Sequence, residues 1–93
     1  MKLLAPPDAF RATKMFRRDR PSQWRSGDLV IAEFLGDSDA VVVRCDPALT
    51  DYGAVLIAAP IDPREEWERP ADGVTQFLRT YAASKGAKFW EPR

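Results

Sequence analysis

The sequence contains no histidine and only one cysteine, Cys45. The absence of histidine excludes the usual zinc, copper and haem ligand sets and every histidine-dependent catalytic triad within this sequence. A single cysteine also excludes an internal disulfide and a cysteine-based zinc site. We therefore expect no metal and no other cofactor. Because no histidine is present to act as its general base, Cys45 is predicted to be a small buried thiol.

Long apolar runs are missing as well. No segment approaches the roughly 20 residues that a membrane-spanning helix needs. Pro6 and Pro7 interrupt the N-terminus before an apolar core of signal-peptide length can form. We therefore expect a cytoplasmic protein that does not bind membranes. The apolar content of 45% is enough for the core of one small domain, residues 1–93.

Two runs of β-branched and aliphatic residues, 29–35 and 40–45, flank a short polar turn, GDSD. This pattern predicts a β-hairpin over residues 28–45. A third run, residues 54–59, ends at a proline and predicts another strand. Because these runs are almost continuously apolar, we expect burial on both faces, or one face on the core and the other against a helix or partner.

Charged residues interrupt the hairpin at Glu33 and Arg44, which we expect to form a cross-strand ion pair. The N-terminal residues 2–5 resemble half a strand, which suggests that a preceding element is missing. The aromatic residues Phe89 and Trp90 are predicted to pack back onto the domain.

The clearest helical pattern spans residues 72–85, with Asp72 as its expected N-cap and Gly86 just beyond its end. Its apolar stripe consists of Val74, Phe77, Leu78, Tyr81 and Ala82. A second helix is predicted over residues 7–19, with a thin stripe formed by Ala9, Ala12, Met15 and Phe16. The predicted fold is α+β: an antiparallel sheet, built from the hairpin and the third strand, that both helices cover.

The charges are unevenly distributed although their sum is zero. Residues 1–27 hold seven Lys or Arg and two Asp (+5), residues 28–72 hold three Arg and eleven Asp or Glu (−8), and residues 73–93 hold four Lys or Arg and one Glu (+3). These blocks either neutralise one another on the folded surface or make the acidic block a docking surface for a basic partner. Arginines around Trp24 suggest nucleic-acid binding, but the acidic block argues against it.

The most conspicuous polar segment is DPREEWERP, residues 62–70. It allows three interpretations. The first is a solvated loop in which Trp67 anchors the segment to the core. The second is an acid–base or metal site made of paired carboxylates, although no nucleophile or phosphate-binding loop accompanies them. The third is a partner-binding surface with an aromatic hot spot inside an acidic rim.

Several segments together resemble the C-terminal part of the SUKH superfamily, which includes fungal cell-wall-synthesis regulators and bacterial immunity proteins. The resemblance lies in LVIAEFLGDSD (29–39), YGAV (52–55), WE (67–68), AD (71–72) and FLRTY (77–81), and LLAPPDAF (3–10) resembles the middle of that domain. The family's N-terminal helices are absent here. The resemblance therefore implies a fragment, a compact variant, or a domain that two copies complete.

This resemblance implies an α+β domain that is not an enzyme and that binds a protein toxin, for instance a nuclease. The leading hypothesis is an immunity protein that occludes a toxin through an acidic surface. The residues predicted to bind the partner are Asp37, Asp39, Asp62, Glu65, Glu66, Trp67 and Glu68. One alternative is a homodimeric scaffold or regulatory module, because missing helices would leave apolar sheet surface exposed. The other is an enzyme that uses the carboxylates.

Overall fold

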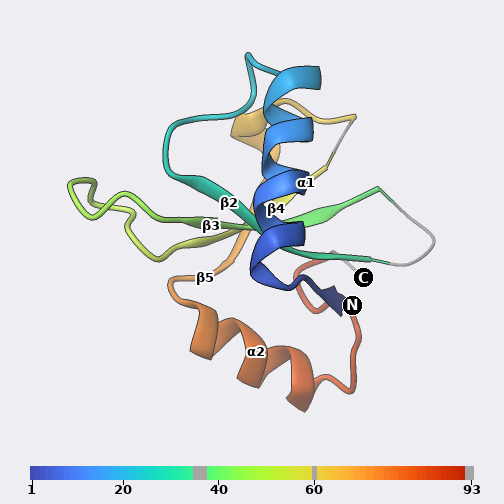
Figure 1. Ribbon diagram of the computed structural model, residues 1–93. Helices are drawn as coiled ribbons and strands as arrows, with labels where there is room; N and C mark the ends of the chain where they lie inside the picture. The colour runs from blue at the N-terminus through green and yellow to red at the C-terminus, as the bar shows by residue number, and fades with distance from the viewer. Residues whose placement is uncertain (35–37, 60, 92–93) are drawn as a thin grey trace.

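The computed structural model describes residues 1–34, 38–59 and 61–91. Its centre is an antiparallel sheet whose five strands follow chain order: β1 (Lys2–Leu3), β2 (Asp28–Glu33), β3 (Ala40–Arg44), β4 (Val55–Ala58) and β5 (Glu68–Ala71). Helix α1 (Pro6–Asp19) connects β1 to β2, the 3₁₀ turn η1 (Arg64–Glu66) precedes β5, and helix α2 (Val74–Ala83) follows it. The two helices lie on opposite sides of the sheet (Figure 1). The predicted α+β fold is confirmed.

The central strand β3 is buried along its whole length because both faces of the sheet are covered. On the α1 side, Val42 packs in a cluster with Trp67 and with Phe16 of the helix. On the other side, Val41 packs in a second cluster with Phe77 of α2. Side chains alternate between the two faces of a strand, so each face of β3 supplies one cluster. Of the two predicted arrangements, burial on both faces holds for β3, whereas β2 alternates between buried and half-buried residues.

Helix α1 is fastened to β2 through one buried threonine. The Thr13 hydroxyl donates a hydrogen bond to the Ala9 carbonyl at 2.7 Å and accepts one from the backbone N–H of Val30 at 2.9 Å. The apolar stripe of this helix is thin, as predicted. Met15, which was expected in that stripe, is instead 50% exposed.

Helix α2 buries Phe77 completely, and the rings of Phe89 and Trp90 lie 5.8 and 5.6 Å from its ring centroid. The predicted return of the C-terminal aromatics to the core is therefore confirmed. The helix ends in a Schellman motif, in which the N–H of Gly86 bonds to the Tyr81 carbonyl at 3.1 Å. The N-cap is Gly73 and not the predicted Asp72.

Three other expectations are wrong. The register places Glu33 opposite Ala40, so Glu33 and Arg44 lie at opposite ends of the hairpin and form no cross-strand pair. Cys45 is exposed because it lies just beyond the end of β3. Strand β5 forms within the segment that was expected to be a loop.

Among the described residues, no helix combines the length and apolar character needed to cross a bilayer.

Candidate functional site

Trp67 holds the acidic segment between β4 and β5 in place. Its side chain is buried, and its ring meets that of Trp24 edge-on, with the centroids 5.7 Å apart. Its indole Nε1–H donates a hydrogen bond to the Asp62 carbonyl at 3.2 Å, which folds the segment back on itself. The prediction that Trp67 anchors this segment in the core is confirmed.

The two arginines beside the glutamates do not neutralise them. Arg64 turns inward, where its guanidinium binds the carboxylate of Asp28 and lies 5.2 Å from the centroid of the Trp67 ring. Arg69 pairs with Asp72 at 2.9 Å. In the described part of the chain, the carboxylates without an ion pair include Asp62, Glu65, Glu66 and Glu68. Their charges are therefore available to a partner.

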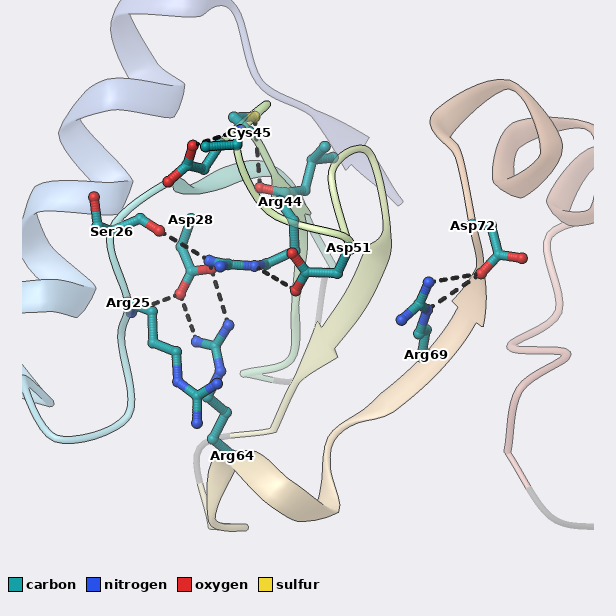
Figure 2. A network of polar contacts seen from close by, with 12 residues as sticks. Arg25, Ser26, Asp28, Arg44, Cys45, Asp51, Arg64, Arg69 and Asp72 are labelled. Atoms are coloured by element: carbon teal, nitrogen blue, oxygen red, sulfur yellow. Dashed lines mark hydrogen bonds and ion pairs between the residues drawn. The ribbon is translucent and has the colours of Figure 1, made fainter.

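Asp28 lies at the centre of a buried charge network (Figure 2). Its side chain has no exposed surface, and it accepts hydrogen bonds from the guanidinium groups of Arg44 and Arg64 and from the backbone N–H of Arg25. Arg44 in turn donates through Nε to Asp51 at 2.9 Å. Two arginines thus face two aspartates, which is the pairing that a buried charge requires. We assign this network a structural role.

The network shifts the pKa values of its members. Burial by itself raises the pKa of the Asp28 carboxyl, but hydrogen bonds from Arg64, from the Arg25 backbone and from Arg44 outweigh it and hold the pKa below the usual 3.8. Burial lowers the pKa of Arg44, while Asp28 and Asp51 raise it above its ordinary value. Both groups are therefore charged at neutral pH.

A cavity of about 250 Å³ opens beside Trp67, at the end of the sheet where β3 begins and β4 ends. Its acidic lining consists of Asp39, Asp62, Glu66, Glu68 and Glu91, and its apolar lining of Ile57, Ala59, Ile61, Trp67 and Trp90. We call this site the acidic cavity. Carboxylates next to aromatic faces attract a cation through charge and through the ring quadrupole. The arrangement therefore suits the end of a lysine or arginine side chain.

One lysine stands close to the acidic cavity. The Nζ atom of Lys88 lies 3.4 Å from Asp39 and 3.6 Å from Glu91, and 4.6 Å from the ring centroid of Phe34. Glu66 and Glu68, which also line the cavity, are exposed. The lysine therefore offsets only part of the negative charge around the cavity.

The acidic cavity brings together most of the residues predicted to bind a partner. The predicted residues that line it are Asp39, Asp62, Glu66, Trp67 and Glu68. Glu65 is exposed on η1 and does not line the cavity, and Asp37 lies outside the described residues. Sequence reasoning missed Trp90 and Glu91 as part of the site. The sequence predicted that the C-terminal aromatic residues pack back onto the domain, but it did not indicate where they pack.

Residues 1–34, 38–59 and 61–91 contain no cluster of three or more Asp, Glu or Cys side chains arranged to hold a metal ion. Comparisons with protein-family models, with curated proteins and with solved structures found no match to this chain.

Proposed function

We propose that this chain is a non-enzymatic protein-binding domain whose acidic cavity binds a basic surface on a protein partner. The observation that carries the proposal is the gathering of five carboxylates around one apolar-floored cavity. The nearby Arg64 and Arg69 are engaged elsewhere. Mutual repulsion among these carboxylates is relieved when a cation approaches. A basic protein supplies both the cation and the additional contact area that a stable complex needs.

The floor of the acidic cavity has the composition of an interface centre. Tryptophan is enriched among residues that dominate binding energy, and both Trp67 and Trp90 line the cavity. Trp67 contacts the ring of Trp24 and the guanidinium of Arg64, which hold its side chain in place. Little side-chain entropy is therefore lost at Trp67 when a partner binds. Ile61 is 93% exposed beside the cavity, where a partner would cover it.

We further propose that the partner is a toxin domain, such as a nuclease, which the chain neutralises by occlusion. A nuclease binds a polyanion, so the surface around its active site is positively charged. An acidic surface of opposite potential is steered to that site and blocks substrate access. The resemblance to SUKH immunity proteins favours this role. The exposed positions of Glu66 and Glu68 favour it over acid–base catalysis, in which the acid is usually held in a partly buried pocket.

The test is affinity capture from source-cell lysate, followed by mass spectrometry and an activity assay of the captured protein. The cavity variant is Glu66→Lys/Glu68→Lys. The matched control is Asp8→Lys/Asp19→Lys, which makes the same charge change at exposed positions on α1. We expect the wild type and the control to capture a basic toxin domain and to inhibit it in a purified assay, and the cavity variant to do neither.

Two results would overturn the proposal. If the cavity variant captures and inhibits the same protein as well as the wild type does, the acidic cavity is not the binding site. If all three chains recover only further copies of themselves, the homodimeric scaffold replaces the immunity function. Sedimentation of the purified chains over a range of concentrations distinguishes these two results.

A further inference from the structure

A second hollow lies at the opposite end of the sheet from the acidic cavity, between α1 and the start of β2. It has a volume of about 580 Å³, which falls within the range of ligand sites for small molecules. Its lining is formed by Phe10, Thr13, Lys14, Arg17, Gly27, Asp28, Leu29 and Cys45. We call it the basic groove. Nothing in the proposed binding function uses it.

One wall of the basic groove is a single face of α1. Phe10, Thr13, Lys14 and Arg17 are spaced at i, i+3, i+4 and i+7, so they form one stripe along the helix. Phe10 is 61% exposed, although large aromatic side chains are usually buried. The Thr13 hydroxyl already has both a donor and an acceptor partner, in Val30 and Ala9. Because the Thr13 hydroxyl is already satisfied, Phe10 and Thr13 form an apolar part of this wall, with the Phe10 ring at one end.

The charge of the basic groove is positive. Within the described residues, neither Lys14 nor Arg17 takes part in an ion pair, whereas the neighbouring Arg11 and Arg18 pair with aspartates on the same helix. The one carboxylate in the lining, Asp28, has a fully buried side chain and is held by two arginines. Lys14 and Arg17, two cations without carboxylate partners, therefore lie beside the apolar side chains of Phe10 and Leu29.

We propose that the basic groove binds a small amphiphile with one carboxylate head and a medium-length alkyl chain. The head is bound by Lys14 and Arg17, and the chain lies over Phe10 and Leu29. Charge complementarity selects the anionic head, and the apolar lining favours an alkyl body.

The backbone beside the groove argues against an added peptide strand. Strand β1 pairs only with Ala32 and Glu33, which leaves the first half of β2 without a neighbour on that side. Its N–H groups are nevertheless satisfied, since Asp28 donates to the Arg25 carbonyl and Val30 to Thr13. A peptide could not form the main-chain hydrogen bonds that strand addition requires there.

Cys45 provides a native reporter for this site, because it is the only cysteine in the sequence and is exposed on the groove wall. The probe is decanoate, kept below the concentration at which it forms micelles, and 1-decanol is the uncharged control. The reaction of Cys45 with N-ethylmaleimide is followed by intact-protein mass spectrometry. At about ten times its dissociation constant, decanoate should slow the reaction about tenfold, while decanol should have little effect.

Two variants locate the head of the ligand. Lys14→Gln/Arg17→Gln should abolish protection by decanoate, whereas Arg11→Gln/Arg18→Gln, on the same helix but outside the groove, should keep it. The proposal is overturned if decanoate gives the wild type no protection, if decanol protects equally, or if the control variant loses protection as well. The comparison of decanoate with decanol on the wild type tests the need for an anionic head even if the groove variant fails to fold. Anionic vesicles that protect Cys45 where decanoate does not would indicate a membrane surface instead.

Discussion

Arg64 donates two hydrogen bonds to Asp28, a residue 36 positions earlier in the chain, and thereby joins η1 to the first residue of β2 (Figure 2). The same guanidinium lies against the ring of Trp67. The position of the acidic cavity therefore depends on a buried carboxylate that does not itself line the cavity. Changes at Asp28 should affect both stability and the shape of the acidic cavity.

Replacing Asp28 with asparagine should destabilise the fold by about 3–5 kcal/mol, because the substitution leaves buried arginines without their counter-charge. The measurement is urea unfolding at neutral pH, followed by tryptophan fluorescence. The control is Asp19→Asn, which changes an exposed carboxylate and should have little effect. Equal midpoints for the two variants would contradict the structural role of the network.

The same carboxylate should make stability depend on pH. The pKa of Asp28 is lower in the folded chain than the usual 3.8, so the unfolded chain binds a proton more readily. The resulting stability is fully present above the unfolded pKa and is lost as the pH falls through the folded pKa, which places the loss below about pH 4. Urea midpoints of the wild type should therefore fall more steeply below pH 4 than those of Asp28→Asn. Parallel acid profiles would show that Asp28 is not responsible.

Replacing Thr13 with valine should cost about 1–3 kcal/mol, since the Val30 N–H then loses its partner inside the protein. The control is Thr80→Val in α2, where the hydroxyl bonds only to the carbonyl of Gln76 and is exposed. Amide hydrogen exchange reports on the bond directly. The Val30 amide should exchange faster in Thr13→Val, and unchanged exchange would show that this bond does not hold α1 to β2.

Much of the fold could be predicted because its local patterns agree with its packing. The stripe of α2 places Phe77 in the core, and the continuous apolar runs of β2 and β3 reflect helices on both faces. Strand β5 escaped prediction because Glu68, Arg69 and Pro70 show no apolar alternation. An edge strand pairs on one side only, so it needs few apolar residues and tolerates proline.

The candidate site was only partly predictable, for a similar reason. The carboxylates of residues 62–68 lie close to Trp67 in the sequence, and their composition suggested a partner-binding surface as one of three interpretations. Trp90 reaches the same cavity from the chain end through packing against Phe34 and Phe77, which local spacing does not encode. The partners of Arg44 depend on strand register, which the length of the turn did not determine.

Gly27 should tolerate substitution poorly. Its φ of +87° lies in the left-handed region, and an added Cβ would lie 2.9 Å from the Cβ of Asp46. Its carbonyl also accepts a hydrogen bond from the Cys45 N–H, so the backbone cannot move away freely. Gly27→Ala should cost about 1–3 kcal/mol. Gly73→Ala, at the extended and uncrowded N-cap of α2, should cost less, about 0.5–1 kcal/mol in the same urea experiment.

Charge reversal at the acidic cavity should leave the fold as stable as before or slightly more stable. Glu66 and Glu68 have no ion pair in the described part of the chain, and each stands among other carboxylates. Replacing both with lysine removes repulsion and creates opposite-charge neighbours. Urea midpoints of Glu66→Lys/Glu68→Lys should equal or exceed those of the wild type, with a larger difference at low ionic strength.

The control Asp8→Lys/Asp19→Lys should behave in the opposite way, because it removes ion pairs with Arg11 and Arg18 and places a cation at the positive end of α1. Residues selected for binding are often not those that maximise stability. A cavity variant that gains stability while losing its partner would show that the carboxylates are kept for binding. A clear loss of stability would instead make them structural, and the partner-binding assignment would then have to move to another surface.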